Sequence, residues 1–334
     1  VLLGAAAASG ALPFPRAAYE QAIHRAGIAV AGSLRGFAAG FDRASTAPAS
    51  ATDGTAATKD ATGAPADAVG LPGDLDRRIE AALPAEARAL ARAGVRRLID
   101  YQDKAYASFY LDRLEKIAAL ERALPASAHE RVGHESPSAA VARYLALWMS
   151  YEDVIRVADL KTRAARFDRV RRETRAAASE LVEVEEYMHP RVEEICDTLP
   201  AWLGRRVLAT GWMRRVLERF TRHGRRVRSS SLPGFLLLHA IGGLRRLRRG
   251  TLRYSVEQAR IESWLALIAQ VLPRDPALAS EIAECQRLVK GYGETHARGL
   301  ARFEAIIAAA VSAPPGVATA QTVRDSRRAA LDSI

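Results

Sequence analysis

Residues 137–175 read PSAAVARYLALWMSYEDVIRVADLKTRAARFDRVRRETR, and this stretch decides the fold class. Ser136 offers a side-chain oxygen that can cap free N–H groups, and Pro137 has a φ angle suited to a first helical turn. No glycine or proline follows within the stretch. The pattern predicts one helix of roughly 35 to 40 residues, about 55 Å long.

Most positions of this stretch are apolar or small, and the charges gather in one narrow stripe on a helical wheel. The stripe consists of Glu152, Arg156, Asp159, Arg163 and Arg166. A helix with so little polar surface is usually buried on most sides, so we expect a central helix with Ile155 in the core. Asp153 and Lys161 interrupt the apolar rows. We interpret them as charges paired with another helix, or alternatively as a polar seam at a subunit contact.

The overall composition indicates a basic protein. The formal net charge is +11, which is typical either of a protein with a polyanionic partner or of an arginine-rich solvated surface. Cys196 and Cys285 are the only cysteines and lie outside any CxxC spacing, so they cannot alone form a four-cysteine cluster or zinc site. Two thiols favour a reducing, cytoplasmic setting. No apolar run approaches the ~20 residues of a membrane span.

The chain divides into four parts. Residues 1–41 are too short for a core of their own, and we interpret them as the C-terminal remnant of an α/β domain, with helices at 2–9 and 16–25 and a short strand at 28–30. Residues 42–73 have the Ala, Thr, Ser, Gly, Asp and Pro content of a flexible linker. Residues 74–313 form a helical domain, and residues 314–334 are expected to be a frayed tail.

Within the helical domain most segments have helical patterns. We expect one helix to end near Gly94 and the next to cover residues 95–124, with a loop at 125–136. A strand-like run occupies residues 182–188, and residues 222–233 are expected to be a loop. Further helices are expected at residues 191–199, 202–220, 235–248, 255–272 and 276–311. The expected fold is therefore mainly α: a large multi-helix domain built on a long central helix, preceded by the remnant and the linker.

The segment from Arg205 to Arg253 contains many arginines and a single acid, Glu218. Guanidinium groups suit carboxylates and phosphates, so the segment favours docking to an acidic protein or binding of phosphates, with a solvated face as the alternative. The charge comes without an aromatic stacking platform or recognition-helix pattern, which disfavours nucleic acid. The candidate partner-binding residues are Arg245, Arg246 and Arg248.

A second unusual stretch, KGYGETHARG at residues 290–299, lies inside the last long helix expected. Each glycine costs a helix about 1 kcal/mol, so a neighbouring helix or a ligand phosphate should approach the backbone there. The candidate cofactor-binding residues are Lys290, Tyr292, His296 and Arg298. His296 shares a face with Ile282 and Val289, and this position is more typical of a core histidine. The sequence contains no nucleophile elbow, HExxH motif or phosphate loop, so no catalytic residue or metal ligand is assigned.

Three stretches resemble a known family: YLALWMSYEDVIRVADLKTRAARFDRVRRE, RLIDYQDKAYASFYLDRL and RLVKGYGETHARGLARFEAI. Together they resemble the C-terminal helical domain of the bacterial indolepyruvate ferredoxin oxidoreductase beta-subunit family. Residues 1–41, with LLGAAAASGALPFPRAAYEQAI and SLRGFAAGF, resemble the end of the gamma-type catalytic domain of 2-oxoacid ferredoxin oxidoreductases.

The resemblance implies an oxidoreductase subunit that takes part in oxidative decarboxylation of an arylpyruvate to its acyl-CoA with reduction of ferredoxin. It also implies that thiamine diphosphate and iron–sulfur clusters sit on a partner alpha subunit, that coenzyme A is a co-substrate, and that this stretch binds none of them. Most of the gamma-type domain is missing, so the stretch alone should be inactive. The alternatives are a helical protein-interaction module without an enzymatic role and a basic nucleic-acid-binding protein.

Overall fold

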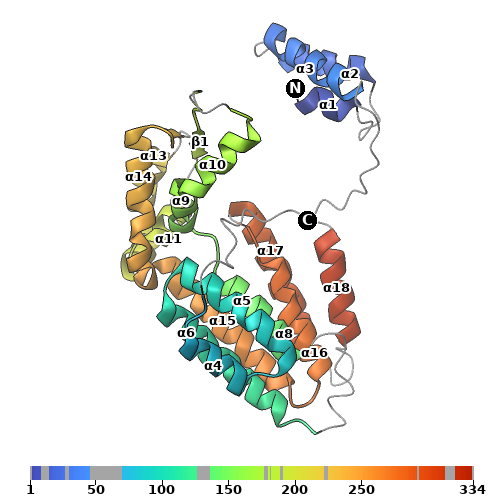
Figure 1. Ribbon diagram of the computed structural model, residues 1–334, viewed down its shortest axis with the longest axis vertical. Coiled ribbons are helices and arrows are strands. Elements are labelled where there is room, and N and C mark those ends of the chain that lie inside the picture. Colours follow the sequence, from blue (N-terminus) through green and yellow to red (C-terminus); the bar gives the residue numbers. More distant parts are fainter. Residues whose placement is uncertain are drawn as a thin grey trace. The chain divides into compact units, whose positions relative to one another are not determined.

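The computed structural model describes residues 2–8, 15–26, 30–45, 70–125, 136–176, 180, 182–188, 191–221, 225–291, 293–312 and 320–332. The chain divides into two compact units, Val1–Asp60 and Ala61–Ile334. The described residues are almost all helical, with two short strands, and the expectation of a mainly α protein is therefore confirmed (Figure 1). Most of the expected linker, residues 46–69, lies outside the described residues.

The first unit consists of α1 (Leu2–Ala8), α2 (Arg16–Ala26) and α3 (Val30–Ser45). Helix α1 lies directly against α3, since a Cβ atom on Gly4 would meet the carbonyl oxygen of Phe37 at 1.9 Å. The rings of Tyr19 and Phe37 stack with centroids 5.9 Å apart. Val30 begins a helix, whereas the sequence suggested that it ends a strand; the rest of that expected strand, residues 28 and 29, lies outside the described residues.

The second unit starts with α4 (Gly73–Ala82), α5 (Ala85–Tyr101) and α6 (Lys104–Arg122), followed by α8 (Pro137–Met149). The expected break near Gly94 is wrong, because α5 runs through this residue. A Cβ atom at Gly94 would lie 2.9 Å from both Ala146 Cβ and the Tyr110 hydroxyl, so the glycine allows three helices to meet closely. The chain turns instead at Asp103, whose carboxylate accepts a 2.7 Å hydrogen bond from the Tyr106 N–H and caps α6.

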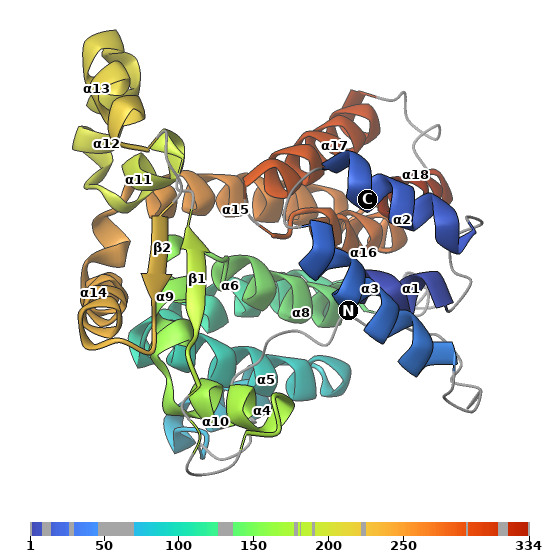
Figure 2. The ribbon, with the colours of Figure 1, turned by 90° about the horizontal axis from the view of Figure 1, so that it is seen from above.

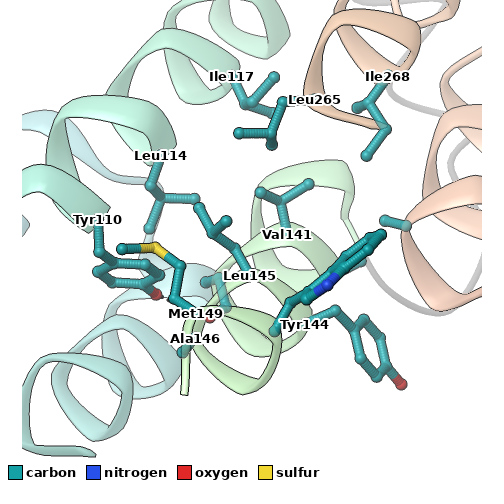
Figure 3. Close-up of a cluster of buried hydrophobic side chains, with 14 of the residues drawn as sticks. Tyr110, Leu114, Ile117, Val141, Tyr144, Leu145, Ala146, Met149, Leu265 and Ile268 are labelled. Atoms are coloured by element: carbon teal, nitrogen blue, oxygen red, sulfur yellow. Dashed lines mark hydrogen bonds between the residues drawn. The ribbon is translucent and has the colours of Figure 1, made fainter. Parts of the chain in front are cut away.

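Helix α8 is the centre of this unit, and most of its side chains are buried. Ser136 caps it as the sequence predicts, accepting a hydrogen bond from the Ala139 N–H at 3.2 Å. Figure 3 shows its apolar side chains, Val141 and Leu145 among them, between residues of α6 and residues of α15 (Leu252–Val271). The core is therefore built around the first third of the stretch quoted above.

The single long helix expected over residues 137–175 is wrong. Helix α8 ends at Met149, α9 covers Val154–Thr162, and α10 covers Ala164–Glu173. Asp153 is the reason for the first break: its backbone is extended and its carboxylate accepts a 2.6 Å hydrogen bond from the Arg156 N–H. An acidic N-cap starts a new helix without a glycine or proline. Arg163, also extended, makes the second break.

Two short antiparallel strands pair across a long stretch of chain. Strand β1 (Glu185–Met188) lies in the expected strand-like run, while β2 (Arg225–Arg228) lies in a segment expected to be a loop. The register places Glu185 opposite Arg228, and these side chains approach to 3.4 Å. Opposite charges across the strands favour this pairing.

Between the strands lie α11 (Val192–Thr198), α12 (Ala201–Ala209) and α13 (Gly211–Thr221), which pack on a small core of their own. After β2 come α14 (Leu232–Gly243) and the 3₁₀ helix η2 (Leu244–Gly250). Helix α14 packs along one side: Leu238 is fully buried, and Gly242 lies over the Asp159 backbone, which a Cβ atom would meet at 3.2 Å. Leu236 and Leu237 are about half exposed.

The chain continues through α15 to α16 (Pro276–Glu284), the 3₁₀ helix η3 (Cys285–Leu288) and α17 (Gly293–Ser312). The single helix expected over residues 276–311 is therefore divided. Gly291 and Gly293 have φ angles of +75° and +61°, a region that glycine adopts without strain and that ends regular helix.

The frayed tail expected at residues 314–334 is also wrong for the part that the structure describes. Residues Ala320–Asp332 form α18, which buries Val323 and Arg327. The Arg327 guanidinium lies 2.6 Å from Glu284 and also pairs with Glu281, while Arg324 bonds the same Glu281 at 2.7 Å. Helix α18 is thus fastened to α16 and η3 by ion pairs as well as by apolar contacts.

Candidate functional site

Arg248 is not on a docking surface, in contrast to the prediction from the sequence. Its side chain is only 2% exposed, and it lies between η2, α5 and the start of α9. Its Nε and Nη2 donate to the two carboxylate oxygens of Asp153 at 2.8 and 3.2 Å, and Nη1 donates to the carbonyl of Tyr101 and the amide oxygen of Gln102. The guanidinium also stacks over the Tyr101 ring, 4.1 Å from its centroid. Arg248 is therefore a structural arginine.

Arg245 and Arg246 are exposed, as a partner-binding role requires. Neither side chain makes an ion pair with another described residue. Arg206, Arg215 and Arg219 on α12 and α13 are likewise exposed without a carboxylate partner among the described residues. Helices α12 to α14 and η2 lie at the same end of the unit in both views (Figures 1 and 2), which we call the basic end.

The basic end also exposes an unusual number of large apolar side chains. Trp202 and Trp212 are 69% and 64% exposed, and Leu232 and Leu247 are 72% and 68% exposed. The other members are Val216, Leu236, Leu237 and Leu244. Exposed tryptophans and arginines are typical of surfaces that bind another macromolecule.

The four residues proposed to bind a cofactor do not come together. Lys290 and Arg298 are exposed, His296 is buried, and Tyr292 lies outside the described residues. His296 and Arg298 are two positions apart on α17, so they face opposite sides of the helix. The close approach expected at this stretch occurs at Gly299, where a Cβ atom would lie 2.1 Å from the carbonyl oxygen of Leu288. A neighbouring turn of the chain, and not a ligand, fills that place.

His296 instead belongs to a buried charged cluster around Glu257, whose side chain is completely buried. Glu257 accepts a 2.8 Å hydrogen bond from the Trp148 indole N–H and lies 2.9 Å from Arg253 and 3.3 Å from Arg260. Glu257 is not among the site residues predicted from the sequence. Its position on the apolar row of Ile261, Trp264 and Ile268 along α15 could have identified it as a buried acid.

The Nε2 atom of His296 lies 3.0 Å from Arg253 and 3.6 Å from Glu257. These two contacts are alternatives. A guanidinium only donates, so Nε2 must be unprotonated to accept from Arg253, whereas it must carry a hydrogen to donate to Glu257. Burial alone would raise the pKa of Glu257. Hydrogen bonding to His296, the charge of Arg253 and the Trp148 hydrogen bond outweigh it and lower this pKa to about 2. Because Arg253 and Trp148 act in both alternatives, the carboxylate stays ionised in either.

A cavity of 630 Å³ lies beside that cluster. Helices α9 and α10 and strand β1 form one side, and Asp197, Arg253 and Gly293 lie on the other. Asp153 and Lys161 both line it. The expected pairing with another helix is confirmed for Asp153, which pairs with Arg248 of η2. Lys161 is also paired, but its partner Glu186 lies on the strand β1 and not on a helix.

Within the described residues no three histidine, cysteine or acidic side chains are arranged to hold a metal ion. None of the helices that the structure describes combines the length and the apolar character needed to cross a membrane. The fold and site thus define a helical protein with buried ion networks, a basic end and a cavity lined by residues of α9 and α10.

A family model matches residues 87–309, and the chain therefore belongs to the Family of unknown function (DUF6537). No curated protein matches the chain. No solved structure matches it either.

Proposed function

We propose that this chain is part of the beta subunit of a cytoplasmic indolepyruvate (2-oxoacid) ferredoxin oxidoreductase, and that its helical unit docks an acidic partner. The resemblance of three stretches of the sequence to that family supports the enzyme assignment. The observation that carries the docking role is the basic end, where Arg245 and Arg246 lie exposed and without a carboxylate among the described residues. Ferredoxin, or another acidic electron acceptor, is the proposed partner.

The chemistry of the holoenzyme would be supplied by thiamine diphosphate, iron–sulfur clusters and coenzyme A. The residues of this chain do not fit an iron–sulfur cluster. Cys196 and Cys285 are both buried, and they belong to different hydrophobic cores. Burial raises the pKa of the Cys285 thiol to about 12, so it stays protonated, whereas a cluster needs thiolates. We therefore assign the clusters and thiamine diphosphate to the partner alpha subunit and derive no step of the reaction from this chain.

Long-range attraction between the basic end and an acidic partner would raise the rate of encounter. Such attraction is screened over a Debye length of about 8–10 Å at physiological salt. The exposed tryptophans and leucines would then provide the short-range contacts, because aromatic residues and arginines carry much of the binding energy at protein interfaces.

The test is charge reversal in the complete two-subunit enzyme. The variant Arg245→Glu/Arg246→Glu should slow ferredoxin reduction several-fold at low ionic strength, and the difference should shrink as salt is added. Turnover with a small neutral dye should not change. The control Arg274→Glu/Arg328→Glu carries the same charge change on exposed residues outside the basic end.

Four other outcomes would contradict the proposal. Equal loss with ferredoxin and dye would indicate a role in folding or subunit docking. No loss with either acceptor would indicate that the basic end is a solvated surface without a docking role. Salt-dependent retention on heparin, lost in the Arg245/Arg246 variant without any effect on ferredoxin, would favour nucleic-acid binding. Failure to co-purify with a thiamine-containing subunit would leave a helical interaction module without an enzymatic role.

A further inference from the structure

The cavity beside α9 and α10 has the size of a small-molecule site. Its 630 Å³ falls within the roughly 300 to 1,000 Å³ of typical ligand pockets. Its walls come from distant parts of the second unit, including β1, the end of α11 and the first residue of α17. It is therefore a product of the tertiary fold, and it lies apart from Arg245 and Arg246.

Aliphatic side chains line this cavity together with charged ones. The aliphatic lining residues are Val154, Val157, Leu160, Ala165, Val170 and Met188, and each is only partly buried. Helix α10 has no fully buried side chain at all, although it carries apolar residues on the side that faces the cavity. Apolar surface that the protein itself leaves uncovered is stabilised by an apolar ligand.

The α9–α10 wall also carries more cationic side chains than the carboxylates that pair with them. Lys161 and Arg166 both pair with the single carboxylate of Glu186. Arg169, one turn beyond Arg166, lines the cavity without a carboxylate partner among the described residues. Glu173 at the exposed end of α10 offsets part of this charge. One positive charge is left over, and it lies next to the aliphatic walls.

The opposite wall limits the charge that a ligand can carry. Glu194 and Asp197 of α11 lie there, and Arg253 is already paired with the buried Glu257. Burial raises the pKa of Asp197, and the charge of Arg253 opposes that effect only in part. A second anionic group at this end would meet carboxylates, so the site favours a ligand with one anionic end.

We propose that the cavity binds an aliphatic monocarboxylate, with the carboxylate at Arg166 and Arg169 and the chain along Val157, Leu160 and Val170. A guanidinium group without a partner is suited to a carboxylate, and the aliphatic side chains beside it suit a hydrocarbon chain. This proposal does not depend on the docking role, since it uses other residues and needs no partner protein.

Three probes with the same chain and different end groups test the proposal: octanoate, octanol and octylammonium. Binding to the full chain is measured by isothermal titration calorimetry. We expect octanoate to bind with one-to-one stoichiometry and at least about tenfold more tightly than octylammonium, since a charge-assisted contact is replaced by repulsion. Octanol should fall between them. Equal affinities for all three probes, or no octanoate binding, would overturn the proposal.

Variants locate the binding. Arg169→Ala should weaken octanoate about tenfold and leave octanol unchanged. Arg172→Ala is the matched control, because Arg172 is exposed on the same helix and does not line the cavity. Val157→Trp should fill the cavity and abolish binding of all three probes, with thermal unfolding as the check on folding. If Arg169→Ala and Arg172→Ala weaken octanoate equally, the ligand sits on the general basic surface and the proposal is wrong.

Discussion

Arg248 and Asp153 form a two-point ion pair that joins the end of η2 to the start of α9, with contacts of 2.8 and 3.2 Å. Both side chains are almost completely buried. The same carboxylate caps α9 through the Arg156 N–H. Asp153 therefore caps α9 after the break that follows α8, and it also neutralises the buried guanidinium of Arg248.

Loss of Arg248 should be strongly destabilising. Arg248→Met removes the partner of a buried carboxylate, and breaking a buried pair in this way costs about 3–5 kcal/mol. Arg245 is exposed and makes no ion pair with a described residue, so Arg245→Ala should change stability by less than about 0.5 kcal/mol. Urea unfolding of the three proteins measures the difference.

A second substitution separates charge burial from packing in this pair. Asp153→Asn keeps an N-cap but removes the charge, so Asp153→Asn/Arg248→Met should be more stable than Arg248→Met alone. If Arg248→Met unfolds at the same urea concentration as Arg245→Ala, the ion pair does not support the fold.

Ile155 should matter far more than the charges on its helix. Its side chain is 1% exposed, and Ile155→Ala should cost about 2–5 kcal/mol through lost burial and a residual cavity. Arg163 pairs with Asp100 and Asp159 in a partly exposed network, so Arg163→Ala should cost no more than about 1 kcal/mol. Equal shifts of the denaturation midpoint would contradict the orientation of α9.

Glu257 should contribute to acid unfolding. Its pKa is lowered from 4.5 to about 2 in the folded protein, so its contribution is complete at neutral pH and is lost as the pH falls from about 4.5 through about 2. The size of this contribution is about 3 kcal/mol. The unfolding free energy of Glu257→Gln should therefore be lower at pH 7 and should fall less steeply between pH 5 and 2.

The measurement is urea unfolding at several pH values, and the difference between the two proteins isolates Glu257 from other carboxylates. Glutamine still accepts from the Trp148 indole, so that hydrogen bond is kept. Parallel pH profiles for both proteins would show that Glu257 is not stabilised as an anion.

Two glycines, one in a tightly packed position and one in open space, test the packing. A Cβ atom at Gly299 would meet the Leu288 carbonyl oxygen at 2.1 Å, and Gly299→Ala should destabilise by roughly 1–3 kcal/mol or more. At Gly243 nothing lies within 4 Å and the backbone is helical, so Gly243→Ala should stabilise by up to about 1 kcal/mol. Thermal unfolding measures both, and a stabilised Gly299→Ala would disprove the close approach.

The helical class could be read from the sequence because it depends on composition and on apolar spacing within each segment. The element ends were harder to predict. Glycine and proline predict helix breaks from the sequence, but two of the breaks lie at aspartates. The side chains of Asp153 and Asp103 cap the helices that follow them, α9 and α6. Gly94, in contrast, does not interrupt α5. A small residue inside a helix indicates either a break or a close neighbour, and only the three-dimensional packing decides between them.

The roles of the arginines could not be separated by sequence. Arg245, Arg246 and Arg248 lie within four positions of one another, and only Arg248 is buried. Its burial depends on Asp153, which is 95 residues away in the chain. Glu257 was closer to being predictable, since an acid on an apolar helical row must find partners when that row is buried.

The hydrophobic core includes residues on both sides of the stretch that matches the family model, residues 87–309. Leu75 and Ile79 of α4 lie before residue 87, Val323 of α18 lies after residue 309, and all three are buried in the same hydrophobic core. A protein trimmed to the matched residues would uncover apolar surface on α5 and α6 and strip Glu281 of both its guanidinium partners. Such a protein would be expected to behave as a loosely packed, aggregation-prone species, because the cooperative folding unit extends beyond the unit of sequence similarity.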